Sequence, residues 1–415
     1  MTPLRNLAAL VLFASATIAP LGAQTAQPAR VWVGSWASAQ QVPEPNNSLA
    51  PGDYKDATLR QIVHLSVGGI ALRVHLSNAF GYQALHVTAV HIAKPLSATG
   101  PAIDPATDKA LTFYGSTDVT IPANSEYISD PIPYPVAALS DLAISIHYEE
   151  APARQTGHPG SRATSYIASG AAVDAADLPK AHKVEHWYQL SGVDVLSPAG
   201  GGAIVALGDS ITDGHGATTN GNDRWTDVLA RRLQADPAYR NVGVLNEGIG
   251  GNHMLTDGLG PNAISRFDRD VLAQTGVRTV ILLEGVNDLG GLTINQEQTA
   301  AVRADFVHRL LASYEQLIVR AHAHNLRIIG ATITPYGGSG YYHPTVTSEA
   351  DRQFINQWIR TPGHFDAVLD FDKVLRDPAH PEQMLAEYNC GDHLHPSPAG
   401  YKAMGEAIPL AALLP

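Results

Sequence analysis

Apolar and polar residues alternate with a period of two from about residue 31 to residue 190. Leu72, Val74 and Leu76 alternate with polar residues, and the same pattern recurs over residues 142–148. Clusters of turn-forming residues separate such stretches, for example Ser129-Asp130-Pro131. Many short alternating strands without a helical stretch between them predict an all-β sandwich domain of the jelly-roll kind over residues 31–190.

Beyond residue 203 the apolar positions follow a different period. Strand-like apolar runs alternate with helical stretches, and the runs cover residues 203–207, 242–246, 279–284, 327–333 and 367–371. Steps of three and four give one long helix an apolar face, formed by Val302, Phe306, Leu310, Tyr314, Leu317 and Ala321. This alternation predicts a three-layer α/β/α domain with a parallel sheet over residues 203–415. A stretch rich in glycine over residues 191–202 is the expected linker.

Two short segments, about 180 residues apart, carry the groups of a nucleophilic hydrolase. Gly208-Asp209-Ser210 ends the first apolar run, so Ser210 is expected where a strand breaks into a turn. Near the end of the chain, Asp392 and His395 lie three residues apart. A serine hydroxyl attacks only when a base takes its proton, and a histidine base needs a carboxylate that fixes its tautomer. We also expect the last helix to begin with Ser397 as N-cap and Pro398 in first position.

Two further segments lie between these two. Residues 245–252 hold a glycine-rich turn after one strand-like run, and residues 284–288 hold Gly-Val-Asn-Asp after the next. Open α/β sheets gather their binding groups at the carboxyl ends of the strands. A glycine N–H and an asparagine NH₂ are suitable donors for an oxyanion hole.

In this order, the four segments resemble the sequence blocks of the GDSL, or SGNH, hydrolase superfamily: Gly-Asp-Ser, a glycine turn, Gly-x-Asn-Asp and Asp-x-x-His. The resemblance implies that Ser210 is the nucleophile, that His395 is the general base and then the acid, and that Asp392 orients it. It also implies an oxyanion hole made by the N–H groups of Ser210 and Gly251 and by the Asn287 side chain.

Several residues of these segments also fit structural roles. We expect the carboxylates of Asp209 and Asp288 to accept backbone N–H groups and hold their turns. The glycine turn could be a dinucleotide fingerprint, but the position that needs the last glycine is His253. A zinc cluster at Cys390, Asp392, His393 and His395 would lack a second ligand pair. We expect Cys390 to be a small buried residue, His393 to face solvent, and the protein to need no cofactor or metal.

Substrate contacts are expected on loops at the carboxyl edge of the sheet: Asn252, His253, Tyr336 and Tyr341. Residues 336–342 are rich in glycine and tyrosine, as loops that stack on sugars often are. Superfamily members with an added β domain resemble carbohydrate esterases, which implies deacetylation of plant polysaccharides or oligosaccharides. A lipase or lysophospholipase, and a glycan-binding protein with an inactive hydrolase domain, remain alternatives.

Charge, the N-terminal segment and the cysteine count bear on the binding partners and on the cellular compartment of the protein. The net charge of −12 and scattered Lys and Arg argue against nucleic acid. Arg5, an apolar run over residues 7–18 and Leu21-Gly22-Ala23 predict a signal peptide over residues 1–23 and therefore export. That run is shorter than the ~20 residues of a membrane span, which favours a signal peptide over a membrane anchor, so no membrane insertion is expected after cleavage. Cys390 is the only cysteine, so the chain forms no intramolecular disulfide. The oligomeric state stays open.

Overall fold

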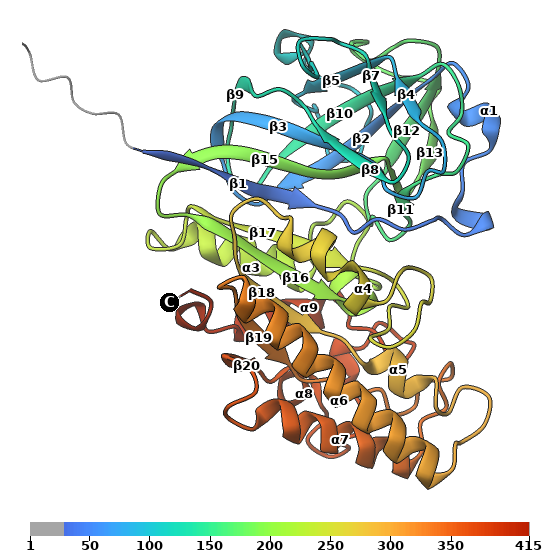
Figure 1. Cartoon of the computed structure of the whole chain (residues 1–415), viewed down its shortest axis with the longest axis vertical. Coiled ribbons are helices and arrows are strands. Elements are labelled where there is room, and N and C mark those ends of the chain that lie inside the picture. The colour runs from blue at the N-terminus through green and yellow to red at the C-terminus, as the bar shows by residue number, and fades with distance from the viewer. Residues whose placement is uncertain (1–28, 415) are drawn as a thin grey trace, which may run out of the picture.

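Two antiparallel sheets packed face to face build the first part of the chain. The computed structural model describes residues 29–414 (Figure 1). One sheet has the order β1-β15-β3-β8, with β9 also paired to β3. Its strands are β1 (Arg30–Ala37), β15 (Leu190–Pro198), β3 (Gly69–Asn78), β8 (Ser125–Ile128) and β9 (Ile132–Val136). The predicted all-β region of antiparallel strands is therefore present.

The second sheet has the order β13-β12-β2-β10-β5-β6. Its strands are β13 (His182–Val184), β12 (Ser165–Ser169), β2 (Ala57–Leu65), β10 (Ser140–Tyr148), β5 (Ala89–Ala93) and β6 (Lys109–Ala110). Two short pairs complete this domain: β4 (Leu85–Val87) with β7 (Val119–Ile121), and β11 (Gly157–His158) with β14 (Trp187–Tyr188). A short helix, α1 (Pro51–Tyr54), precedes β2. Apolar side chains of β3 and β10 at alternate positions fill the core between the sheets.

The predicted linker is wrong for most of its length. Residues 190–198 form β15, which pairs with β1 on one side and β3 on the other. Only residues 199–201 separate β15 from the first strand of the second domain. Alternating valines in this stretch, Val193 and Val195, are fully buried. This alternation is typical of a strand. The three glycines at residues 200–202 had predicted a linker of twelve residues, but the connection has only three.

A five-stranded parallel sheet forms the centre of the second domain, with the order β17-β16-β18-β19-β20. The strands are β16 (Gly202–Gly208), β17 (Val242–Gly248), β18 (Val277–Leu283), β19 (Arg327–Ala331) and β20 (Ala367–Leu369). They match the five predicted strand-like runs. Every residue of β16 is buried, as expected for a central strand covered on both faces.

Helices cover this sheet on both faces (Figure 1). They are α2 (Ser210–Asp213), α3 (Trp225–Ala235), α4 (Ala263–Phe267), α5 (Val286–Gly290), α6 (Ala300–Ala323), α7 (Val346–Arg360), α8 (Phe371–Leu375) and α9 (Pro398–Ala407). Helix α6 is the predicted long helix, and it buries Leu310, Tyr314 and Leu317, whereas Val302 in its first turn is 45% exposed. The predicted start of α9 is confirmed, because the Ser397 hydroxyl caps the helix by accepting the Gly400 N–H.

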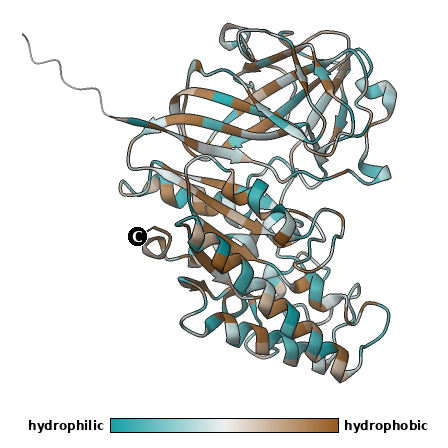
Figure 2. Ribbon diagram, viewed as in Figure 1, coloured by the Kyte–Doolittle hydropathy of each residue, from teal (hydrophilic) through white to brown (hydrophobic). Residues whose placement is uncertain are grey.

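The two domains pack directly against each other. Strand β1 lies against β17 (Figure 1), and Ser38 forms a parallel bridge with Asn246. A single cluster of buried apolar residues runs through both domains, and Figure 2 shows apolar stretches on the strands of each. Among residues 29–414, no helix has the length and apolar character that crossing a membrane requires. The predicted signal peptide, residues 1–23, lies outside the described residues.

Candidate active site

Ser210 stands at the carboxyl end of the central strand β16, where α2 begins. Asp209 is the N-cap of this helix, and its carboxylate accepts the Ile211 N–H at 2.9 Å. The expected turn-holding role of Asp209 is therefore confirmed. A carboxylate at a helix N-terminus fixes the turn, so the position of the Ser210 side chain is set by the backbone.

The structure brings together the three groups that the sequence placed far apart. The Ser210 Oγ lies 2.7 Å from His395 Nε2, and the His395 Nδ1 lies 2.6 Å from Asp392 Oδ2. With Asp392 ionised, His395 Nδ1 donates to it and Nε2 is left as the acceptor for the Ser210 hydroxyl. This is the geometry in which an imidazole takes the proton of an attacking serine.

Asp392 is held by its own loop. Its Oδ1 accepts the backbone N–H groups of Leu394 and His395, each at 2.9 Å, while Oδ2 faces the imidazole. Although partial burial raises it, these hydrogen bonds and the neighbouring His395 lower the pKa of Asp392 well below its usual range. The Asp392 carboxylate is therefore ionised near neutral pH. Helix α9 begins directly after this loop and anchors its far end.

Ser210, Gly251 and Asn287, which carry the three predicted oxyanion donors, line one cleft. Gly251 has a φ of +66°, a conformation that suits glycine. Within the described residues, neither the Gly251 N–H nor the Ser210 N–H donates to a protein acceptor. Asn287 in α5 donates one NH₂ hydrogen to the Asn252 carbonyl at 2.7 Å. Its Oδ1 accepts the Tyr342 hydroxyl at 2.6 Å, which fixes the orientation of the amide and leaves the second NH₂ hydrogen free.

Asp288 does not take part in this chemistry. It is 2% exposed, and its carboxylate accepts the backbone N–H groups of Met254 and Leu255 at 2.9 Å and 3.2 Å. The expected structural role of Asp288 is therefore confirmed. These bonds tie the segment that follows the glycine turn to the helix that carries Asn287, so two of the sequence blocks are joined.

An open cleft of about 520 Å³ lies over these groups. Besides Ser210 and His395, its wall includes His253 and Tyr341, two of the predicted substrate-binding residues. Tyr341 is 63% exposed and Leu259, on the same wall, is 53% exposed. This volume is ordinary for a small-molecule site. The cleft can take an ester with a modest group on each side of the carbonyl.

Two of the predicted substrate-binding residues, Asn252 and Tyr336, do not line this cleft, so these two predictions are wrong. The Asn252 side chain is fully buried, where it donates to the Pro261 carbonyl and accepts from Arg266. Tyr336 is 1% exposed and packs edge-on against Tyr342. Both residues support the loops that line the cleft from behind. Both residues lie on loops, as predicted. The direction of their side chains could not be predicted, because a loop lacks the regular repeat that sets side-chain direction in a helix or strand.

Arg266 in α4 connects the sequence blocks behind the cleft, and sequence reasoning missed it. Its guanidinium is fully buried and donates to the carbonyls of Gly208 and Glu247 and to the Asn252 side chain. It also pairs with Asp270 at 2.9 Å. Burial, with Asp288 nearby, raises the pKa of Asp209 to about 7, and burial raises the pKa of Glu284 well above its usual value. The buried Arg266 guanidinium therefore lies near two acids, Asp209 and Glu284, whose protonated forms are favoured by burial.

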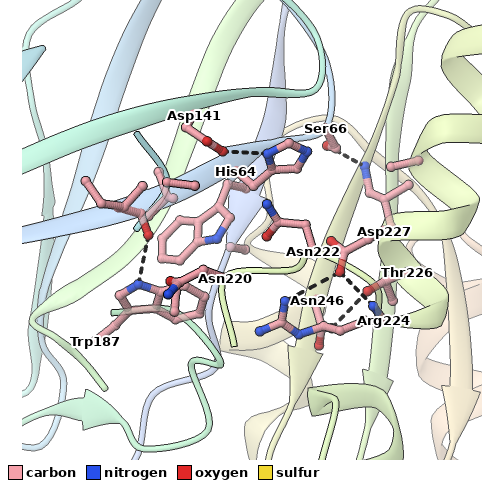
Figure 3. Close-up of a pocket in the computed structure, with 18 of the residues that line it drawn as sticks. His64, Ser66, Asp141, Trp187, Asn220, Asn222, Arg224, Thr226, Asp227 and Asn246 are labelled. Carbon is pink, nitrogen blue, oxygen red and sulfur yellow. Dashed lines mark hydrogen bonds and ion pairs between the residues drawn. The ribbon is translucent and has the colours of Figure 1, made fainter. Parts of the chain in front are cut away.

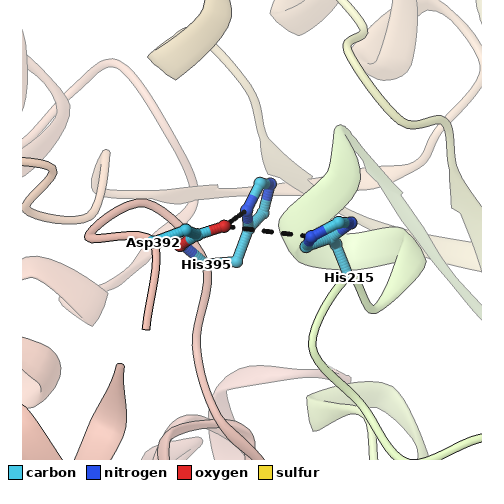
Figure 4. Close-up of side chains that lie close together, drawn as sticks. All are labelled: His215, Asp392 and His395. Atoms are coloured by element: carbon cyan, nitrogen blue, oxygen red, sulfur yellow. Dashed lines mark hydrogen bonds and ion pairs between the residues drawn. The ribbon is translucent and has the colours of Figure 1, made fainter. Parts of the chain in front are cut away.

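His215 is a second residue that sequence reasoning missed. Its ring centroid lies 4.1 Å from that of His395, and its Nε2 lies 3.8 Å from Asp392 Oδ2 (Figure 4). Ligating atoms of these three residues all lie within 4.8 Å of one another. Both ring nitrogens of His395 already face Ser210 and Asp392. The signal was present in the sequence, since His215 stands between two glycines directly after the serine block.

Cys390 and His393, considered with Asp392 as a metal cluster, are both exposed. His393 faces solvent as expected, but the expectation of a buried Cys390 is wrong. Asp392 lies between Gly391 and His393, which have positive φ angles of 115° and 57°. Neither residue belongs to the His215–Asp392–His395 group.

A second, smaller cavity of about 60 Å³ lies between the two domains (Figure 3). His64 and Trp187 of the β domain line it on one side, and Asn220, Asn222 and Arg224 line it on the other. It has room for a few water molecules. None of the groups around Ser210 reaches it, so the larger cleft is the candidate active site.

Comparison with known proteins agrees with this assignment. Residues 206–403 match the model of the GDSL-like lipase/acylhydrolase family. No curated protein sequence matches the chain. Similar solved structures include a G-D-S-L family protein from Desulfitobacterium hafniense DCB-2, which is 26% identical with a TM-score of 0.36, covering 51% of this chain and 97% of that one.

Two further solved structures are similar over the same half of the chain. An aryl esterase from M. smegmatis is 16% identical with a TM-score of 0.37, covering 50% of this chain and 95% of that one. The acetyl xylan esterase AlAXEase is 15% identical with a TM-score of 0.34, covering 49% of this chain and 96% of that one. Because every TM-score is below 0.5, no substrate follows from these similarities.

Proposed function

Since residues 206–403 of this chain belong to the GDSL-like lipase/acylhydrolase family, and the protein is therefore a serine ester hydrolase, we propose that it removes short acyl groups from carbohydrate esters. The observation that carries the chemistry is the hydrogen-bonded series from Ser210 through His395 to Asp392, beside three free donors. The choice of acyl group and of alcohol rests on the shape and the lining of the cleft.

The reaction follows from this geometry. Ser210 Oγ attacks the ester carbonyl carbon while His395 Nε2 takes the hydroxyl proton, and the carbonyl oxygen becomes an oxyanion. In this proposal the N–H groups of Ser210 and Gly251 and the second Asn287 NH₂ hydrogen receive the oxyanion. His395 then gives its proton to the departing alcohol oxygen, which leaves an acyl-serine. Water, deprotonated by the same imidazole, attacks the acyl carbon. The bond from that carbon to Ser210 Oγ then breaks, His395 returns the proton to Oγ, and the acid is released.

The lining of the cleft supports a carbohydrate alcohol. Tyr341 presents an exposed aromatic ring, and ring faces of this kind stack on the apolar faces of sugars. His253 adds a polar group that can bond hydroxyl groups. The volume of about 520 Å³ is enough for a sugar unit beside a short acyl group. A single exposed leucine, Leu259, offers little surface to a long acyl chain.

A fluorophosphonate probe tests the nucleophile. It should label the parent protein and fail to label Ser210→Ala, because the probe forms a bond only with an activated serine. No labelling of a correctly folded parent would instead favour a glycan-binding protein with an inactive hydrolase domain. Ser339→Ala, which changes another serine of the cleft wall, is the matched control and should label like the parent.

Two substrate series test the acyl group and the alcohol. With p-nitrophenyl esters from acetate to palmitate, kcat/KM should be highest for the shortest chains and fall as the chain outgrows the cleft. Acetate release should then be found from at least one member of a panel of acetylated polysaccharides and oligosaccharides. A preference for long chains would replace this proposal with a lipase or lysophospholipase, for which the exposed Leu259 would be the first apolar contact.

We also propose that the protein is exported with removal of its first residues. The proposal rests on the order of Arg5, the apolar run over residues 7–18 and Leu21-Gly22-Ala23 in the sequence. N-terminal sequencing of the protein recovered from outside the cytoplasm should begin close after Ala23. A protein retained in the cytoplasm with Met1 intact would refute export and leave the ester hydrolase activity untouched.

A further inference from the structure

His215 is held in place by the backbone on both sides. Gly214 and Gly216 take positive φ angles of 103° and 91°, which bring the chain sharply around His215. The His215 N–H donates to the Ser210 carbonyl at 2.9 Å, and its carbonyl accepts the Tyr401 hydroxyl at 2.7 Å. A side chain at position 216 would collide with the Pro396 carbonyl, directly after His395. The His215 ring is therefore fixed relative to both Ser210 and His395.

This ring covers the outer side of the catalytic couple. It lies tilted by 40° against the His395 ring, and its Nε2 faces Asp392 Oδ2, the oxygen that accepts from His395 (Figure 4). The His395 side chain is 10% exposed, whereas His215 is 47% exposed. His215 thus stands between the imidazole and bulk water.

The partner that holds His215 comes from the other domain. Arg162 lies on the loop between β11 and β12 of the β domain, and its guanidinium donates to His215 Nδ1 at 3.0 Å. The same loop is pinned to the hydrolase domain, since the Asn220 N–H donates to the Arg162 carbonyl at 2.8 Å. His158, at the start of this loop, pairs with Asp213 of α2 at 2.9 Å, with both side chains buried.

The Arg162 contact also sets the tautomer of His215. A guanidinium has donors only, so His215 Nδ1 must be the acceptor and Nε2 must carry the hydrogen. That N–H then points toward Asp392 Oδ2. Burial, aided by His395 and Arg162 and opposed by Asp392 and Asp213, lowers the pKa of His215 to about 4. The ring is therefore neutral near pH 7 and does not repel the imidazolium that forms on His395.

We infer that His215 is a positioning residue for the Asp392–His395 couple, and that Arg162 holds it there, so that the N-terminal β domain completes the active site of the hydrolase domain. The inference rests on the ester hydrolase chemistry proposed above and is independent of the acyl group or alcohol. His215 excludes water from one side of the imidazole and directs a second N–H dipole at the carboxylate oxygen. Both effects keep His395 Nε2 aimed at Ser210.

Steady-state kinetics of Arg162→Ala, His215→Ala and the double variant test this inference with p-nitrophenyl acetate. We expect His215→Ala to lower kcat about tenfold, since small losses of alignment are costly in catalysis, with KM changed less than twofold. Arg162→Ala should lower kcat about threefold to tenfold. Because Arg162 acts through His215, the double variant should be no slower than His215→Ala alone. His215→Asn keeps an acceptor and a donor and should recover part of the loss.

Glu185→Ala is the matched control. It removes a hydrogen bond between Glu185 of the β domain and Thr219, in the same part of the interface but without contact to His215, and should keep the parent kcat. The inference is overturned if His215→Ala keeps kcat within twofold, if KM moves instead of kcat, or if the losses of the two single variants multiply. A parent without activity or fluorophosphonate labelling would refute the proposed function instead, so the two failures are distinct.

Discussion

Replacing Asn287 by alanine should separate catalysis from folding more sharply than any other single change. The Asn287 side chain is 2% exposed and makes two hydrogen bonds, one to the Asn252 carbonyl and one from the Tyr342 hydroxyl. Its remaining hydrogen is one of three donors beside Ser210. The substitution deletes that donor and leaves the N–H groups of Ser210 and Gly251 in place.

The expected magnitude follows from these contacts. Loss of one oxyanion donor lowers kcat ~10²–10³-fold, or about 2.7–4 kcal/mol of transition-state stabilisation. In the folded state, the lost bond to Asn252 costs about 1 kcal/mol, and the Tyr342 hydroxyl loses its acceptor at a further cost of about 1 kcal/mol. Tyr342 lines the open cleft, so water can replace part of that bond. A domain stable by about 5–15 kcal/mol stays folded after such a loss.

The assay combines kcat for p-nitrophenyl acetate with urea unfolding of the same preparations. Tyr342→Phe is the matched variant, because it keeps the ring and leaves the Asn287 amide in place but no longer fixes its orientation. We expect it to lower kcat about tenfold, between the parent and Asn287→Ala. An Asn287→Ala protein that is folded and within threefold of the parent kcat would refute the assignment of Asn287 to the oxyanion hole.

Three further predictions concern stability. Although burial lowers it, hydrogen bonds with Asp194 and Glu126 raise the pKa of His75 from 6.5 to about 9, so its contribution is full below pH 6.5 and is lost as the pH rises to 9. Urea unfolding of the parent should therefore weaken over this interval, and the parent should lose more stability there than His75→Gln does. Ser397→Ala should cost about 1 kcal/mol of unfolding free energy by removing the cap of α9, with kcat changed less than fivefold. Arg266→Met should cost about 3–5 kcal/mol in the same assay, because it leaves the buried Gly208 and Glu247 carbonyls and the Asn252 side chain without their guanidinium donor and removes one partner of the Arg266–Asp270 pair. An equally stable variant would contradict the role given to this residue.

Much of the fold could be predicted because each domain has one consistent apolar period. Apolar residues at every second position predicted the antiparallel strands, because each of these strands buries one face. Continuous apolar runs that alternate with helical stretches predicted the parallel sheet, because its strands bury both faces. The linker failed because β15 carries glycine and serine among its valines, and its pairing with β1 and β3 joins segments more than 100 residues apart. Such long-range pairing leaves no mark within the strand itself.

The candidate catalytic residues could be predicted from the sequence for a different reason. Ser210, Asn287, Asp392 and His395 lie in short segments whose residue types are chemically required. The first two follow the parallel strands β16 and β18, whose carboxyl ends meet at one edge, and the other two lie on the loop before α9. Tyr336 was misplaced because its loop could face either way, and the chain turns it into the core. Local composition predicts that a loop exists but does not predict which of its side chains point into the cleft.

The supporting residues could not be predicted, because their function depends on how separate elements dock. Arg266 lies in none of the four sequence blocks, yet its guanidinium bonds the carbonyl of Gly208 before the nucleophile and the side chain of Asn252 after the glycine turn. A charge with no exposure persists only where several acceptors surround it, and here these acceptors are the backbones that must be held in register. Burial thus couples folding to the relative position of these two sequence blocks, since a displacement of either one would break hydrogen bonds of the buried guanidinium. The precision of the site is in this way maintained by a residue that never meets the substrate.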